Sequence, residues 1–214
     1  MKIGVFDSGV GGLSVAQAIQ KAFPKYEILL REDIKNLPYG NKTPAIILEF
    51  VKPILQELID LGCDCVVIAC NTVSTTLITE LRELFPLPLI AVEPMIKLAS
   101  EQTNTNIIAV CATPTTLASK RYKFLKDEYA ADVKVLEPDC RDWASMIQEN
   151  KINQKIFTER IGEVLDQGAD VIVLGCTHYH WIEEDINRLA KGRATVIQPE
   201  QAIIRQLKRV ISGL

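Results

Sequence analysis

The sequence lacks several features that would assign it to a common class of protein. Its 214 residues carry 24 lysines and arginines against 27 aspartates and glutamates, so no excess of positive charge points to nucleic acid. No apolar run approaches the ~20 residues that a transmembrane helix needs, and the first residues lack the apolar core of a secretory signal peptide. We therefore expect a cytoplasmic protein, with neither nucleic acid nor a membrane as its partner.

Cysteine and histidine are too sparse for a disulfide scaffold or a metal centre. Six cysteines are present, and several lie in apolar, strand-like runs, which is typical of a protein from a reducing compartment. Cys63 and Cys65 are predicted to be buried, inert thiols. The two histidines, His178 and His180, stand close to Cys176, but their spacing is not that of a closed zinc site. The sequence predicts no metal.

Short apolar runs alternate with longer amphipathic stretches over nearly the whole chain, whose residues are 48% hydrophobic. Apolar residues recur about every four positions between 46 and 59, which indicates a helix that Pro53 should kink by removing a backbone donor. Alternating strands and helices favour an α/β fold with mainly parallel sheets flanked by helices. The predicted strands lie near residues 2–6, 27–31, 65–69, 88–92, 106–111, 133–137, 171–175 and 194–198.

Two segments about a hundred residues apart share one pattern, which predicts two similar lobes. Residues 62–72 read Gly-Cys-Asp-Cys-Val-Val-Ile-Ala-Cys-Asn-Thr, and residues 168–178 read Gly-Ala-Asp-Val-Ile-Val-Leu-Gly-Cys-Thr-His. We place the first lobe at residues 1–93 and the second at 94–198. A C-terminal helix at 199–214 should pack back on the first lobe, and the active site should lie in the cleft between the lobes.

Each repeated segment ends on a cysteine that is followed by polar side chains. Because a continuous apolar run is typical of a central parallel strand, Cys70 and Cys176 should stand at strand ends, where open α/β sheets bind ligands. If the repeats face each other, one thiol lies on either side of the ligand. Such a pair can take a proton from one face of a carbon and return one to the other. A lone cysteine at a strand end is more often structural, but two in matching positions favour a functional role.

Neighbouring groups should activate these thiols. A helix N-terminus stabilises a thiolate, and so does a protonated His178, so we expect thiol pKa values lowered toward neutrality. Asp7 could accept a proton from one thiol or orient it, and His178 could do so for the other.

Three further motifs have both a structural and a functional interpretation. Residues 6–13, Phe-Asp-Ser-Gly-Val-Gly-Gly-Leu, should place free N–H groups at a helix start, where an anion is favoured, but their spacing is not that of a dinucleotide fingerprint. Pro38-Tyr-Gly40 can be a plain turn. In residues 112–116, Ala-Thr-Pro-Thr-Thr, helix capping accounts for at least one hydroxyl. Taken singly, these motifs leave ligand binding open.

Taken together, the motifs resemble those of glutamate racemases, in the aspartate/glutamate racemase superfamily. The matching segments, in the same order over essentially the full chain, are Asp7-Ser-Gly-Val-Gly-Gly12, Pro38-Tyr-Gly40, Cys70-Asn-Thr72, Thr113-x-x-Thr116 and Gly175-Cys-Thr-His-Tyr179. The resemblance implies interconversion of L- and D-glutamate without a cofactor, which supplies D-glutamate for peptidoglycan synthesis. No lysine motif for pyridoxal phosphate is evident. A homodimer is also suggested by the resemblance alone.

The resemblance further implies a role for each matched residue. Cys70 would deprotonate D-glutamate and Cys176 would deprotonate L-glutamate, with the opposite thiol returning the proton. Asp7 and His178 would assist the thiols. The residues that would hold the substrate are Asp7, Ser8, Tyr39, Gly40, Asn71, Thr72, Thr116, Thr177 and His178.

The sequence departs from the family pattern in three places. Eight residues after Cys140 stands Gln148, where the family usually has a glutamate, and a one-residue shift toward Glu149 could restore the carboxylate. Asn36 replaces a basic residue, and Gln198-Pro199 replaces an Asp-Ser pair. Two alternatives therefore stay open. One is a racemase of aspartate or of several amino acids, and the other is a homologue that binds an acidic amino acid or a protein partner without turnover.

Overall fold

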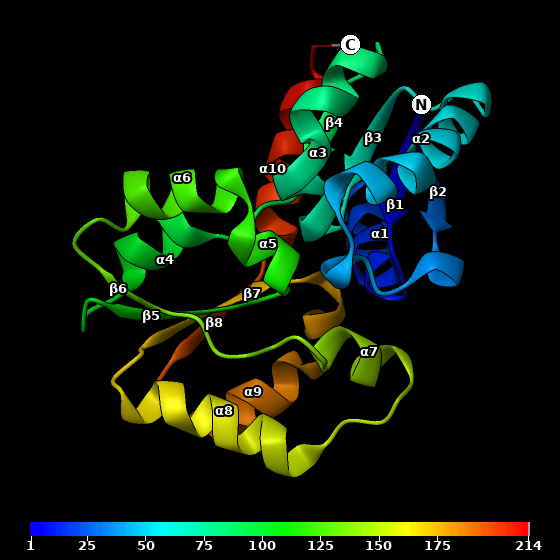
Figure 1. The fold of residues 1–214 in the computed structure, drawn as a ribbon. Coiled ribbons are helices and arrows are strands. Elements are labelled where there is room, and N and C mark those ends of the chain that lie inside the picture. Colours follow the sequence, from blue (N-terminus) through cyan, green and yellow to red (C-terminus); the bar gives the residue numbers. More distant parts are fainter. Residues whose placement is uncertain (214) are drawn as a thin grey trace.

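The computed structural model describes residues 1–213, which form two α/β lobes (Figure 1). The first lobe contains β1 (Lys2–Asp7), α1 (Gly11–Ala22), β2 (Glu27–Glu32), the 3₁₀ helices η1 (Ile34–Asn36) and η2 (Tyr39–Asn41), α2 (Pro44–Asp60), β3 (Cys65–Ile68), α3 (Asn71–Leu84) and β4 (Leu89–Ala91). The second contains α4 (Ile96–Gln102), β5 (Ile107–Ala112), α5 (Pro114–Ala118), α6 (Lys120–Tyr129), β6 (Lys134–Leu136), α7 (Trp143–Gln148), α8 (Gln154–Asp166), β7 (Val171–Gly175), the 3₁₀ helix η3 (Thr177–Ile182), α9 (Glu183–Ala190) and β8 (Thr195–Ile197). The helix α10 (Glu200–Ile211) follows the second lobe.

The two sheets have the same topology. Their strand orders are β2-β1-β3-β4 and β6-β5-β7-β8, and each neighbouring pair is parallel. Each of the eight predicted strand segments overlaps an observed strand. The predicted fold class, two similar lobes with mainly parallel sheets flanked by helices, is therefore confirmed.

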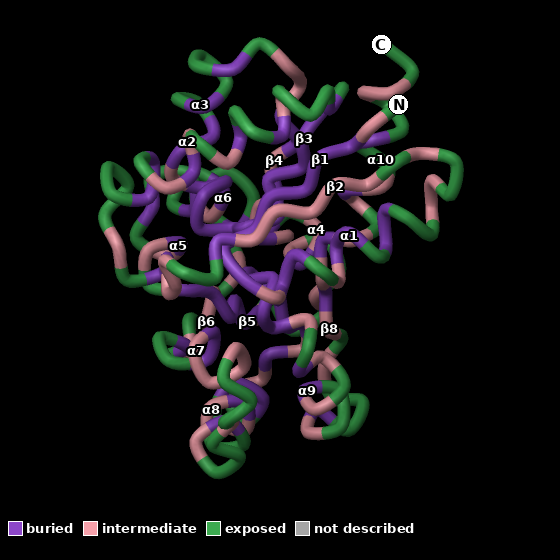
Figure 2. Tube along the Cα trace, turned by 90° about the vertical axis from the view of Figure 1, so that its right-hand side faces the viewer, coloured by how far each residue is buried: buried purple, intermediate pink, exposed green. Residues whose placement is uncertain are grey.

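The repeated segments form equivalent inner strands, β3 and β7. Every residue of both strands is buried, because helices cover both faces of each sheet, and this explains their unbroken apolar sequence. In Figure 2 the buried part of the chain runs through the inner strands, whereas β2 at the sheet edge is only partly buried. Cys176 follows directly after β7, and Cys70 follows β3 after one intervening residue.

The helix α10 packs on the first lobe although it follows the second lobe in sequence. Ile203 and Leu207 belong to the apolar cluster that contains Ile3, Val5 and Ile19 of the first lobe. The boundary between residues 93 and 94 stays a prediction. Among the helices of residues 1–213, none combines the length and apolar character that a membrane span requires.

We predict that Leu207→Ala lowers the free energy of unfolding by about 2–5 kcal/mol, as is usual when a fully buried leucine is truncated. Leu207 has no exposed surface. Gln206→Ala, one residue away on the exposed side of α10, is the matched control and should change stability by less than about 0.5 kcal/mol. Urea unfolding measures both variants. Equal effects in the two would contradict the packing of α10 described here.

Candidate functional site

The carboxyl ends of β1, β3 and β7 bring Asp7, Cys70 and Cys176 into one buried region where the lobes meet. Asp7 has no exposed surface, and Cys70 and Cys176 are only 4% and 7% exposed. Burial is the largest cause of the raised pKa of both thiols; the charge of Asp7 adds to the rise in both, and Cys70 adds to the rise in Cys176. These three groups therefore lie close enough to act on one another electrostatically.

Asp7 ties the two lobes together through its carboxyl group. It accepts hydrogen bonds from the backbone N–H groups of Gly9, at 3.0 Å, and Gly12, at 3.1 Å, in its own lobe. Thr177 of the second lobe donates its Oγ1 hydroxyl to the same carboxyl at 3.0 Å. Burial raises the pKa of Asp7 to about 7, and these three hydrogen bonds oppose that rise.

The two thiols have different immediate neighbours. Sγ of Cys70 lies 3.3 Å from Oγ of Ser8. Sγ of Cys176 lies 3.9 Å from Nδ1 of His178. A hydroxyl can orient a thiol or stabilise a thiolate, whereas a neutral imidazole nitrogen can accept a proton.

Burial controls the pKa values of these groups. It raises the pKa of Cys70 to about 11 and raises that of Cys176 further, and it lowers the pKa of His178 to about 4. The backbone N–H groups that follow each cysteine lower the thiol pKa values, but by less than burial raises them. The expectation of thiol pKa values near neutrality, helped by a protonated His178, is therefore wrong for this closed arrangement. Desolvation outweighs the helix N-terminus.

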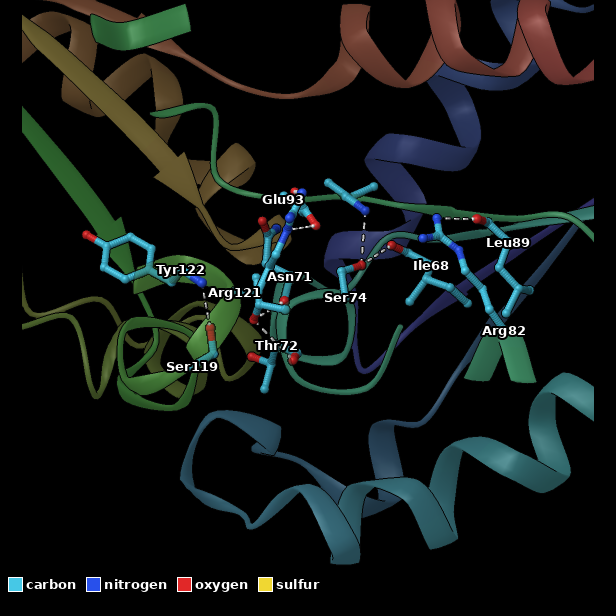
Figure 3. Close-up of polar contacts among 12 residues, drawn as sticks. Ile68, Asn71, Thr72, Ser74, Arg82, Leu89, Glu93, Ser119, Arg121 and Tyr122 are labelled. Atoms are coloured by element: carbon cyan, nitrogen blue, oxygen red, sulfur yellow. Dashed lines mark hydrogen bonds and ion pairs between the residues drawn. The ribbon is translucent and has the colours of Figure 1, made fainter. Parts of the chain in front are cut away.

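The first turn of α3 presents Asn71 and Thr72 to the region between the lobes. Ser74 holds this turn in place, because its Oγ donates to Ile68 O at 2.9 Å and accepts from Val92 N–H at 3.0 Å (Figure 3). The amide of Asn71 is buried, and neither its nitrogen nor its oxygen has a hydrogen-bond partner among residues 1–213. An unpaired buried polar group costs about 1–3 kcal/mol, so a ligand that pairs with this amide would be stabilised.

Three threonine hydroxyls from the two lobes meet beside this turn. Thr72 Oγ1 lies 3.0 Å from Thr113 Oγ1 and 3.4 Å from Thr116 Oγ1, and the last two atoms lie 3.0 Å apart. Thr113 also caps α5, because its side chain accepts from Thr116 N–H. These hydroxyls can rotate toward an anionic ligand. Thr113 is the member of this cluster absent from the predicted binding residues, although its motif contains it.

The turn at Tyr39 and Gly40 packs closely against the second lobe. A Cβ atom on Gly40 would lie 2.7 Å from Cβ of Thr113, so the contact requires glycine. The hydroxyl of Tyr39 donates to Asp33 at 2.6 Å and is therefore already engaged. Asn36, which departs from the family pattern, donates to both carboxylate oxygens of Asp33 at 2.9 Å. Asn36 thus supplies Asp33 with a hydrogen-bond donor, although it is not the basic residue of the family pattern.

Gln148, and not Glu149, occupies the position beside His178. Its Oε1 lies 3.0 Å from His178 Nε2 and accepts from Val10 N–H at 3.2 Å. Glu149 is exposed and pairs with Lys151 at 3.1 Å. The suggestion that a one-residue shift restores a carboxylate is therefore wrong, because the last turn of α7 directs residue 148 to the site.

Known proteins resemble this chain over almost its whole length. Residues 4–207 match the family described as Asp/Glu/Hydantoin racemase. The glutamate racemases of Stutzerimonas stutzeri and Pseudomonas paraeruginosa are 36% and 37% identical to it over 98% of this chain and 81% of their own length. Escherichia coli glutamate racemase, crystallised with L-glutamate and the activator UDP-MurNAc-ala, superimposes with a TM-score of 0.87 at 27% identity, over 99% of this chain and 82% of that one. The Francisella tularensis glutamate racemase, crystallised with D-glutamate, gives a TM-score of 0.81 at 29% identity, over 99% and 81% of the two chains.

We predict that Gly11→Ala destabilises the closed arrangement of the lobes. Its Cβ atom would lie 2.5 Å from the backbone carbon of Thr177, so the lobes must shift, and overpacking of this kind costs about 1–3 kcal/mol. Gly162→Ala in α8, where the new Cβ meets nothing within 4 Å, should leave the protein as stable or stabilise it by up to about 1 kcal/mol. Thermal and urea unfolding compare the two variants. If Gly11→Ala were as stable as the wild type, the close approach of α1 to η3 would be ruled out.

Proposed function

This chain belongs to the Asp/Glu/Hydantoin racemase family, and on that premise we propose that it interconverts L- and D-glutamate by means of two opposed thiols, Cys70 and Cys176. The observation that carries the proposal is the placement of these two buried thiols at equivalent strand ends, with Asp7 acting on both. Glutamate as substrate rests on the names of the relatives. In the cytoplasm of a bacterium, this reaction would supply D-glutamate for peptidoglycan synthesis.

In the proposed reaction one proton is removed from the α-carbon and another is added to its opposite face. The thiolate of Cys176 takes the α-proton of L-glutamate, and the Cα–H electrons remain on carbon as a carbanionic transition state. The thiol of Cys70 delivers its proton to the opposite face, which yields D-glutamate and leaves Cys70 as the thiolate. The reverse direction uses the same steps with the two thiols exchanged.

The buried site suits this chemistry because the α-proton of an amino acid is only weakly acidic. A thiol whose pKa lies near 11, as burial makes that of Cys70, forms a stronger base once it is ionised. Closure also removes water, so polar groups that face the substrate act more strongly on the developing charge. We propose that this site uses neither an organic cofactor nor a metal.

The polar residues around the thiols would bind the ammonium and carboxylate groups of glutamate. Asn71 supports this assignment most directly, because its buried amide lacks partners among residues 1–213. The side chains and backbone groups that we assign to substrate binding are Asp7, Ser8, Tyr39, Gly40, Asn71, Thr72, Thr116, Thr177 and His178. Tyr39 would contribute through its backbone and ring, since its hydroxyl is bonded to Asp33.

We predict that Cys70→Ser or Cys176→Ser lowers the racemisation rate by at least about 10³-fold, because a serine hydroxyl is far too weakly acidic to supply the base. Circular dichroism of L- or D-glutamate, without added pyridoxal phosphate, measures the rate. Cys63→Ser and Cys65→Ser are controls that should affect stability at most. Loss of activity in either control with Cys176→Ser fully active would exclude the two-thiol assignment.

The two serine variants should differ in which enantiomer of glutamate still exchanges its α-proton with D₂O. Cys70→Ser retains Cys176 and should exchange L-glutamate only, whereas Cys176→Ser retains Cys70 and should exchange D-glutamate only. Proton NMR of the α-position follows this exchange. The opposite pattern would mean that Cys70 deprotonates L-glutamate and Cys176 deprotonates D-glutamate.

We predict that kcat/KM rises with pH through about 7, because Asp7 must be ionised to accept a proton near Cys70 and its pKa is raised to about 7 by burial. Below that pH the carboxyl is protonated and cannot accept. The profile should be the same in both directions, since the two enantiomers have equal free energies. Asp7→Asn should lower the rate and abolish this inflection. A wild-type profile that stays flat between pH 6 and 8 would exclude the role of Asp7.

The amide at position 148 motivates a second candidate, which is binding of an acidic amino acid without turnover. Calorimetry with L- and D-glutamate and with aspartate detects binding, and α-deuterium uptake in D₂O detects even slow proton transfer. Binding without any uptake would favour this candidate, and uptake with aspartate but not glutamate would favour an aspartate racemase.

A further inference from the structure

Gln148 contacts both lobes at the point where they close over the thiols. Its Oε1 accepts from the backbone N–H of Val10 at 3.2 Å and lies 3.0 Å from Nε2 of His178. Gly9 makes this approach possible, because a Cβ atom there would lie 2.8 Å from both Gln148 Oε1 and His178 Nε2. The contact of Gln148 with Val10 and His178 thus depends on the glycine at position 9, between β1 and α1.

The contact with Val10 determines which nitrogen of His178 carries hydrogen. A backbone N–H can only donate, so the atom of Gln148 that faces it is the carbonyl oxygen and not the NH₂ group. That same oxygen can only accept, so Nε2 of His178 must carry the hydrogen. Burial lowers the pKa of His178 to about 4, which keeps the ring neutral at pH 7 and leaves Nδ1 unprotonated.

The unprotonated nitrogen is the one that faces a thiol, since His178 Nδ1 lies 3.9 Å from Sγ of Cys176. Building on the function proposed above, we propose that Gln148 is a positioning residue that fixes the tautomer of His178, so that Nδ1 can accept the proton of Cys176. A residue bonded to the far side of the ring thereby makes His178 the base for one thiol. Cys70 has Ser8 and Asp7 near it instead.

The proton inventory of this step balances. The S–H bond of Cys176 breaks as an N–H bond forms at Nδ1, which gives a thiolate and an imidazolium. The thiolate then takes the α-proton of L-glutamate while Cys70 gives its proton to the other face. After the product leaves, the imidazolium proton returns through water to the thiolate of Cys70, which restores both thiols and the neutral ring.

An amide and a carboxylate at position 148 have different consequences. The oxygen of Gln148 accepts from Nε2–H without adding charge, so the ring stays neutral. A glutamate there would place a negative charge beside the ring, raise the pKa of His178 and favour the imidazolium, whose Nδ1–H cannot accept a proton. Gln148 therefore adapts this site to a neutral base.

Nitrogen NMR of histidine-labelled protein tests the tautomer directly. The chain contains two histidines, so the variant His180→Gln assigns both sets of signals. The wild type should show a protonated Nε2 and an unprotonated Nδ1 at pH 7. Gln148→Met should lose this preference, and Gln148→Glu should protonate both nitrogens. A wild-type His178 with hydrogen on Nδ1, or an unchanged spectrum in Gln148→Met, would overturn the proposal.

Half-reaction exchange tests the consequence for catalysis. In a Cys70→Ser background, Gln148→Met should slow α-deuterium exchange of L-glutamate by at least about tenfold, because the base at His178 is compromised. In a Cys176→Ser background the same change should leave exchange of D-glutamate within about twofold, which a general loss of structure would not do. Equal slowing of both half-reactions would overturn the proposal.

Two controls separate this proposal from the proposed function. Glu149→Gln alters the exposed neighbour and should leave both the NMR signals and the exchange rates unchanged. If the wild type exchanges no α-proton at all, the proposed function fails, while the NMR spectra still decide the tautomer. Gln148→Glu, which preserves size and shape, keeps the spectroscopic test available if Gln148→Met does not fold.

Discussion

Hydrogen bonds around Asp7 join the two lobes and hold the thiols away from water, and the chemistry of the site depends on that closure. The carboxyl of Asp7 binds N–H groups of its own lobe and the hydroxyl of Thr177 in the other. Glycines at 9, 11 and 12 allow this contact, since a Cβ atom at any of them would collide with Asp7, Thr177, Gln148 or His178. The resulting burial raises the pKa values of Asp7 and both cysteines and lowers that of His178.

The duplicated architecture makes the thiols equivalent in position but not in surroundings. Both follow an inner strand of a four-stranded parallel sheet. Cys70 precedes the long helix α3 and lies beside a hydroxyl, whereas Cys176 precedes the 3₁₀ helix η3 and lies beside an imidazole. A racemase must treat two mirror-image substrates with equal overall efficiency. In the reaction proposed above, these different neighbours would be two ways of supporting the same kind of base, a thiolate.

The sequence predicts the strands, the two lobes and the position of both cysteines, because continuous apolar runs and Gly-x-Asp turns are local signals of buried parallel strands. It fails for the thiol pKa values, since a helix N-terminus is visible in the sequence but the degree of burial depends on the other lobe. It also fails at Glu149, where the register of α7 decides which side chain faces His178. The contact between Gln148 and Val10 joins residues 138 positions apart, and no local pattern indicates it.

The location of the isotope after reaction in D₂O tests the two-thiol account most directly. The wild-type protein is incubated with L-glutamate in D₂O, and the reaction is stopped before one tenth of the substrate is converted. The two enantiomers are then separated by chiral chromatography, and the isotope at the α-carbon of each is measured by mass spectrometry. The account predicts deuterium in the newly formed D-glutamate and ordinary hydrogen in the remaining L-glutamate, because the base that removes the proton is not the acid that returns one. Rapid deuteration of the remaining L-glutamate, or retention of the original hydrogen in the product, would contradict it.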